Sequence, residues 1–353
     1  MKKYLFIYLI SLLFISCNQK DKIVLGAIIP LTDNNSDLGT ATANAMELCA
    51  EEWNGKGGVD GKKIILDIND SHSDPKLGKT LAQKIMLKST PLMVYSLVSG
   101  VALNIQKITK NKQSIMMACV GSVELFDNDK DFTLRNFISP GNVGEGISNY
   151  LVENYKGKPL TILYINNTFG ESYARTVKEY SLNKGIQVRQ VIAYDDVTNY
   201  RDLIVKSNLT SEDILYIAGS GKSIGVLIKQ LREQGYDGVI LGDPNLPNNS
   251  ALAVAGEVMD NVFFLDIDKP DTKEYNNFVK TYQSRYHSFP DNFAIIAYAT
   301  CGYLLDLAYT NNTLSTKEIM KIANSGYVYH SIIGNLSVVN NEFVFPTKIT
   351  GVK

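Results

Sequence analysis

The sequence predicts an α/β protein built from two doubly wound parallel-sheet lobes. Strand-like apolar runs alternate with amphipathic helical stretches along the chain, which is the pattern of repeated βα units. The alternation stops at an extended segment with turn residues, 137–141, and then restarts. About 335 residues follow the N-terminal segment, more than one hydrophobic core usually holds, so two lobes are expected.

The N-terminal residues have the composition of an export signal. Met1 to Lys3 is basic, and 4–15 is apolar except for one serine. This run is shorter than the roughly 20 apolar residues that cross a bilayer, but it has the length of the apolar part of a signal peptide. We therefore exclude it from the fold prediction and expect an exported protein.

The end of this segment predicts a lipid anchor. Ser16 followed directly by Cys17 resembles the bacterial lipoprotein box, in which the cysteine is lipidated and becomes the first residue. We expect a signal peptide over 1–17, a polar tether over 18–21, and a protein anchored at the cell envelope, facing the periplasm or the cell surface. The alternative is a signal anchor with an incidental cysteine.

Charge and cysteine content exclude several classes of function. The chain has 35 basic and 36 acidic residues, a balance that provides no field to attract nucleic acid or anionic lipid. Cys49, Cys119 and Cys301 are far apart and show no CxxC or Cys/His spacing. Cys49 shares an apolar helical stripe with Leu48, which favours buried packing. No metal, redox centre or other cofactor is expected.

The first half contains strands that are apolar on consecutive residues, as in sheets covered on both faces. These strands are expected at 22–29, 64–68, 92–97 and 115–120, with helices between them at 38–54, 75–88 and 102–110.

The second half repeats this order. Strands are expected at 160–165, 188–193, 214–218 and 239–241, with helices at 172–184, 200–207 and 223–234. A strand at 262–267 then precedes one long helical region, 271–311. The tail, 332–352, is β-like, with turns at Gly334 and Asn340-Asn341.

Ligands of open α/β sheets bind outside the carboxyl ends of the strands, so the segments that follow each strand are the candidate site. They offer hydroxyls, glycines, one aromatic ring and one carboxylate, which suit a small polar ligand whose anionic end meets helix N-termini. The segments are 32–38, 99–100 and 121–122 in the first half, and 167–169, 219–221 and 243–245 in the second.

An enzyme is not expected. His72, His287 and His330 are not adjacent to these turns, so no serine triad is predicted, although an amidase or esterase that uses the same cleft is the enzymatic alternative. The sequence Gly219-Ser220-Gly221-Lys222-Ser223 ends like a phosphate-binding loop. That motif needs a glycine where Tyr216 stands, so a glycine-rich turn is the simpler interpretation.

A collinear set of short motifs resembles the leucine/isoleucine/valine-binding protein family of ABC-transporter receptors. Order and spacing match from about Lys22 to Lys353. The motifs are Gly57 to Ile64, Asn69-Asp70, Asp74-Pro75, Phe169-Gly170-Glu171 and Asn199 to Ile204.

The resemblance implies a type I periplasmic-binding-protein fold that captures an amino acid, or a related carboxylate or amide, by hinge closure. The implied partner is a membrane ABC permease, a ligand-sensing receptor is the alternative, and a monomer is expected. We expect a three-segment hinge with crossings near Ser139-Pro140, Asp266 and Ala323. The first lobe would then comprise 22–138 and 267–322, and the second 139–266 and 323–353.

The family's ligand positions fall on seven residues of this chain. Ser99 matches the serine that donates to the ligand carboxylate, and Asp243 is the only carboxylate where the family pairs an acid with the α-ammonium. The others are Leu38, Gly121, Ser122, Phe169 and Ser220.

The sequence departs from the family at three places. A Gly-Pro-Glu-Gly pattern is absent around Asp243, which puts ammonium pairing in doubt. A tyrosine is missing near Ser220, which enlarges the pocket. Ser73 and Val98 stand where some members carry a first-lobe disulfide.

Overall fold

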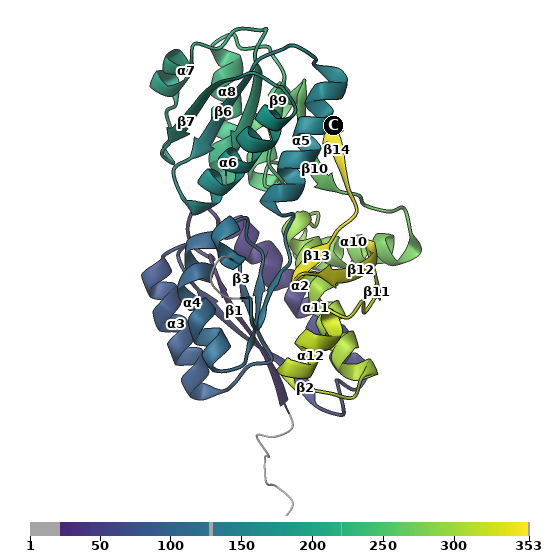
Figure 1. Cartoon of the computed structure of the whole chain (residues 1–353). Coiled ribbons are helices and arrows are strands. Elements are labelled where there is room, and N and C mark those ends of the chain that lie inside the picture. The colour runs from purple at the N-terminus through teal and green to yellow at the C-terminus, as the bar shows by residue number, and fades with distance from the viewer. Residues whose placement is uncertain (1–21, 127–129, 220, 352–353) are drawn as a thin grey trace, which may run out of the picture.

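The computed structural model describes residues 22–126, 130–219 and 221–351. The chain forms two α/β lobes, one above the other in Figure 1, and each lobe has its own sheet. This confirms the predicted fold class. Cys17 and Ser220 lie outside the described residues, so the structure gives no geometry for either prediction.

The first lobe contains an eight-stranded sheet in the order β11-β12-β13-β5-β4-β3-β1-β2. The strands from β13 to β2 pair in parallel, and β12 pairs antiparallel with both of its neighbours. The bounds are β1 Lys22–Ile29, β2 Lys63–Asp70, β3 Met93–Ser96, β4 Ile115–Ala118, β5 Thr133–Arg135, β11 Tyr329–Ser331, β12 Gly334–Val339 and β13 Glu342–Val344.

Helices cover both faces of this sheet. Successive side chains along a strand point to opposite faces, and the side chains on both faces are apolar here, so each face needs a cover. Ala27 and Tyr95 belong to the core beneath α2 (Ser36–Gly55) and α11 (Asn292–Thr310), whereas Ile28 and Val94 belong to the core beneath α3 and α4. The remaining helical elements are α3 Pro75–Lys88, α4 Ser99–Asn111, η2 Val123–Phe126, α10 Lys273–Tyr286 and α12 Thr316–Ala323.

The second lobe contains a six-stranded sheet in the order β14-β10-β9-β8-β6-β7, parallel except for β14. Its strands are β6 Leu160–Ile165, β7 Val188–Tyr194, β8 Ile214–Ala218, β9 Ile240–Gly242, β10 Val262–Ile267 and β14 Thr347–Gly351. Its helical elements are α5 Pro140–Asn154, α6 Thr168–Asn183, α7 Arg201–Ser207, α8 Gly221–Glu233, α9 Asn249–Ala255 and η3 Gly256–Met259.

The third passage between the lobes differs from the expected one near Ala323. Strands β11 to β13 extend the first sheet, and only β14 joins the second, so the chain crosses between Val344 and Thr347. The physical reason is core packing in the first lobe: the rings of Phe343 and Tyr303 lie 4.9 Å apart, and Leu336 is fully buried. The prediction that the second lobe contains all of 323–353 is therefore wrong for β11 to β13.

The helical region expected over 271–311 consists of two helices, α10 and α11. The backbone of His287 is left-handed (φ 54°), Pro290 follows, and Asp291 caps α11 by accepting a hydrogen bond from the Ala294 N–H at 3.0 Å. Within the described residues, α11 is the one helix long and apolar enough to span a membrane. Most of it is buried inside the first lobe, so it is a core helix.

Candidate functional site

A small cavity of about 60 Å³ lies between the lobes, beyond the carboxyl ends of β3, β4, β6 and β9. Both lobes contribute to it, as expected for an open parallel sheet. Of the seven predicted ligand residues, Leu38, Ser99 and Phe169 line it. The other lining residues are Asn35, Leu97, Val98, Cys119, Val120, Phe137, Asn167, Asn245 and Phe293.

Ser99 gives the cavity a polar corner. It is the first residue of α4, it is buried, and its Oγ has no hydrogen-bond partner among the described residues. The first N–H groups of a helix have no partner within the helix and carry a partial positive charge. The first turn of α4 contains no acidic residue. This corner can therefore receive an anionic group.

Three asparagine side chains supply the other polar groups on the wall. Asn167 caps α6, its Oδ1 accepting from the Gly170 N–H at 2.9 Å. The Asn35 amide donates to Ser73 Oγ at 3.1 Å, and the Asn245 amide donates to the Gly219 carbonyl at 3.2 Å. No Asp, Glu, Lys or Arg among the described residues lines this cavity.

Aromatic rings form the apolar wall. Phe137, just before the first interlobe passage, stacks on Phe293 of α11 with centroids 5.6 Å apart and planes 18° apart. Phe169 faces them from the second lobe and packs on Tyr173 at 4.7 Å. A flat or compact apolar group fits between such rings.

Asp243 does not line the cavity. Its side chain is fully buried, and its two oxygens accept hydrogen bonds from the N–H groups of Gly219 and Asn245, each at 2.6 Å. Burial raises the pKa of the Asp243 carboxyl to about 8, although these two hydrogen bonds oppose the shift. Asp243 thus fixes the ends of β8 and β9 and holds Asn245 at the wall.

Gly121 and Ser122 lie at the contact between lobes rather than on the cavity wall. A Cβ atom on Gly121 would lie 2.0 Å from Cε2 of Tyr173. The Tyr173 hydroxyl donates to the Ile138 carbonyl at 2.6 Å. The Ser122 hydroxyl donates to Glu124 at 2.6 Å, and Arg135 donates to the Ser122 carbonyl.

Polar contacts join the lobes at two rims. At one, Glu124 of the first lobe accepts from Ser172 at 3.2 Å and from Arg175 at 2.9 Å, both on α6. Burial alone would raise the pKa of Glu124, but hydrogen bonds from the Ser122 hydroxyl, the Glu124 backbone N–H and the Ser172 hydroxyl, together with the Arg175 charge, outweigh it and leave the pKa below its ordinary value. At the other, Asn34 donates to Asp196 at 3.2 Å. The lobes are in contact on both sides of the cavity.

One histidine lies closer to a strand-end turn than expected. His72 Nδ1 is 2.8 Å from Thr32 Oγ1, in the segment that follows β1. The expectation that no histidine adjoins these turns is therefore wrong. Thr32 also donates directly to Asp70 at 2.6 Å, and His72 Nε2 lies 3.3 Å from the same carboxylate. Because the Thr32 hydroxyl already gives its proton to Asp70, His72 is not positioned to accept that proton as the base of a triad does. None of the three lines the cavity.

The chain is similar to proteins of known class. The model of a family described as periplasmic binding protein matches residues 22–344. A Leu/Ile/Val-binding protein homolog 2 from Brucella abortus is 23% identical over 349 residues, covering 96% of this chain and 92% of that protein. A Leu/Ile/Val-binding protein homolog 3 from Brucella melitensis is 25% identical over 239 residues, and the match spans 66% of this chain and 64% of that relative.

Two solved structures have the same fold. The branched-chain amino acid transporter substrate-binding protein LivJ from Streptococcus pneumoniae, in complex with isoleucine, matches with a TM-score of 0.83 at 18% identity, covering 94% of this chain and 96% of that one. A solute-binding protein from Rhodopseudomonas palustris, in complex with benzoate, matches with a TM-score of 0.83 at 17% identity, covering 94% and 93%.

Proposed function

The chain belongs to the periplasmic binding protein family, and from this premise we propose that it captures a small carboxylate ligand between its lobes for an ABC importer. The ligand class is an amino acid or a related carboxylate, because the helix N-terminus at Ser99 favours a carboxylate over the amide that the sequence also left open. The chain acts as a monomer outside the cytoplasm. A receptor that passes the ligand signal to a membrane sensor would use the same cavity and is the alternative.

The observation that carries the proposal is the position of Ser99. Its buried hydroxyl and the N-terminus of α4 meet at the interlobe cavity, where an anionic group gains hydrogen bonds and a favourable helix dipole. The carboxylate of the ligand is therefore assigned to this corner. Its apolar part lies against the rings of Phe137, Phe169 and Phe293.

The size of the cavity supports a hinge motion. Its volume is about 60 Å³, whereas pockets for small molecules are typically roughly 300–1,000 Å³. A ligand therefore enters while the lobes are apart. Closure brings together the two rims, Glu124 with Arg175 and Asn34 with Asp196, and favours the ligand-bound state through added contacts.

The wall also bears on the amino group of an amino-acid ligand. An ammonium buried without a counter-charge is costly unless it is well hydrogen-bonded, and no carboxylate of the described residues lines the cavity. The amide oxygen of Asn245 is one acceptor that the second lobe offers there, because its amide nitrogen already donates to Gly219. The amide oxygen of Asn167 already accepts from the Gly170 N–H. A carboxylate without an amino group fits the same wall.

The cavity wall does not support the amidase or esterase alternative. Cys119 is the one thiol on it, and burial raises the pKa of that thiol to about 12, which keeps it protonated and unreactive at neutral pH. No histidine lines the cavity among the described residues.

Export and anchoring complete the proposal. The apolar run over 4–15, followed by Ser16-Cys17, supports cleavage before Cys17 and lipidation of its side chain. The mature chain is then anchored to the membrane by the lipid at its N-terminus.

Mass spectrometry of small molecules that co-purify with the chain lacking residues 1–17 tests the function. The proposal expects a carboxylate of low molecular mass, released on unfolding and rebound by the refolded protein. A ligand without any acidic group would contradict it.

A further inference from the structure

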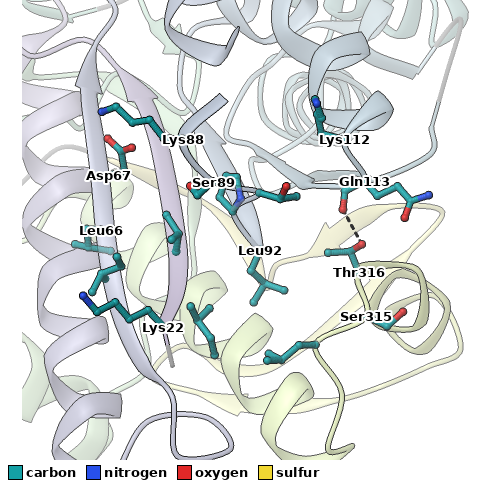
Figure 2. Close-up of a pocket in the computed structure, with 16 residues that line it drawn as sticks. Lys22, Leu66, Asp67, Lys88, Ser89, Leu92, Lys112, Gln113, Ser315 and Thr316 are labelled. Atoms are coloured by element: carbon teal, nitrogen blue, oxygen red, sulfur yellow. Dashed lines mark hydrogen bonds between the residues drawn. The ribbon is translucent and has the colours of Figure 1, made fainter. Parts of the chain in front are cut away.

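A broad basic groove lies at the end of the first lobe opposite the ligand cavity. Its volume is about 1100 Å³. It is lined by the start of β1, the middle of β2 and the segments that lead into β3 and β4, so it lies at the amino ends of the strands. Figure 2 shows Lys22, Lys88 and Lys112 around it, with Asp67 as the one carboxylate in its lining.

Four exposed lysines surround this end of the lobe. Lys22 and Lys63 are register partners at the starts of β1 and β2, and Lys88 and Lys112 stand at the ends of α3 and α4. None of the four forms an ion pair with a carboxylate of the described residues. The balanced charge of the whole chain hides this local excess, because composition gives a sum and not a distribution.

An exposed leucine accompanies the lysines. Leu87 is next to Lys88 in the last turn of α3, and 86% of its surface is exposed, the largest value among the exposed large apolar residues of the described chain. Lysines together with a projecting apolar side chain are the composition of surfaces that lie in the headgroup region of a bilayer.

The position of the proposed anchor indicates what covers this surface. Cys17 precedes Lys22 by five residues, and five residues span at most about 17 Å when fully extended. Strand β1 begins at this end of the lobe (Figure 1). A lipid on Cys17 therefore keeps Lys22, on the wall of the basic groove, within that distance of the membrane.

We propose that this end of the first lobe is a membrane-facing surface, on which Lys22, Lys63, Lys88 and Lys112 bind the headgroups of anionic lipids and Leu87 enters the interface. The inference rests on the lipidation of Cys17 in the proposed function. It gives the orientation of the anchored protein while it is not docked on the permease, with the ligand cavity separated from the bilayer by the length of the first lobe.

The test uses the lipidated full-length protein in vesicles. A polarity-sensitive fluorophore is attached at Leu87→Cys, or at Val205→Cys on α7 of the second lobe as the control; Val205 is 70% exposed, and Cys49, Cys119 and Cys301 are buried. The vesicles contain about 30% phosphatidylglycerol, which gives a negative surface potential. The emission of the probe at 87 should shift to the blue, and nitroxide lipids should quench it. The probe at 205 should do neither.

The lysines are tested by Lys63→Gln, Lys88→Gln and Lys112→Gln in one chain. Because each lysine near an anionic surface changes affinity by roughly fivefold, the equilibrium constant between the quenched and unquenched states should fall by on the order of 100-fold. Phosphatidylcholine vesicles, or about 1 M salt, should have the same effect. The small molecule that co-purifies with wild type should still co-purify, which separates this inference from the ligand-binding proposal.

Equal quenching at 87 and 205, or quenching at 87 that is indifferent to phosphatidylglycerol and to the three substitutions, would overturn the inference. A mass without an acyl group at Cys17 would remove the tether and overturn it as well. A probe at 87 that stays in water on anionic vesicles would point instead to a protein partner on this surface.

Discussion

The ring of Tyr173 in the second lobe occupies the space that a Cβ atom on Gly121 of the first lobe would fill, 2.0 Å from Cε2. Tyr173 is fully buried, and its hydroxyl donates to Ile138, so the ring cannot move aside at low cost. Gly121 is thus a point at which the two lobes pack closely, because only a residue without a side chain leaves room for the Tyr173 ring. Its lack of a side chain is a condition of the contact between the lobes in this structure.

Gly121→Ala should therefore hold the lobes apart and weaken ligand binding by at least about tenfold, because the contacts of the closed state are lost. Calorimetry gives the affinity and small-angle scattering the interlobe opening. Gly55→Ala is the matched control, since nothing lies within 4 Å of a Cβ atom there. A Gly121→Ala protein that binds and closes like wild type would show that closure does not require this contact.

Asp243 gives a dependence of stability on pH. Burial raises the pKa of its carboxyl from 3.8 to about 8, so the folded protein keeps a proton that the unfolded chain loses above about pH 4. The free energy of unfolding therefore falls as the pH rises from about 4 to 8, by up to about 1.4 kcal/mol per pH unit from this group. Denaturant titrations at several pH values give the free energy of unfolding, and its fall with rising pH should be less steep in Asp243→Asn than in wild type. Equal slopes in both proteins would contradict the assignment.

The fold was largely predictable because buried parallel strands are written as continuous apolar runs. The run 160–165 matches β6, and 262–267 matches β10. The tail 332–352 was recognisable as β-structure, but the residue pattern of a strand does not determine which of the two sheets the strand joins. That choice depends on Tyr303 and Phe343 meeting in the core, which is a tertiary contact.

The site was predictable to the level of segments. The strand-end rule selected 167–169 and 243–245, but a rule about segments does not state which side chain faces the cavity. Phe169 and Asn245 face it, whereas Asp243 turns inward to two backbone N–H groups. Phe293 carries no local signal, because its helix α11 reaches the site from a distant part of the chain.

Asn245→Asp should change selectivity toward amino groups. It places a carboxylate on a wall that has none among the described residues, where an ammonium would form a charge-assisted hydrogen bond. The ratio of affinities for leucine and for 4-methylpentanoate, its analogue without the amino group, should rise by about tenfold or more. Competition calorimetry measures this ratio, and an unchanged ratio would show that residue 245 does not face the ligand.

Cys17→Ala should leave the precursor unprocessed or release the protein from membranes, because the lipid attachment point is removed. Fractionation and intact-mass measurement report both outcomes. Unchanged membrane association together with an unchanged mass at the N-terminus would exclude lipidation at this residue.

Ser99→Ala tests most directly whether the interlobe cavity binds a carboxylate. The substitution removes a hydrogen bond to a charged group, worth roughly 1.5–3 kcal/mol, so affinity should fall by about ten- to a hundredfold. Ser114→Ala is the control: its buried hydroxyl donates to the Pro91 carbonyl at 2.7 Å away from the cavity, so its loss should change stability and not affinity. The measurement is calorimetric titration of both variants with the ligand identified by mass spectrometry. Binding should weaken in Ser99→Ala alone, whereas wild-type affinity in Ser99→Ala would show that the ligand carboxylate does not bind at this residue.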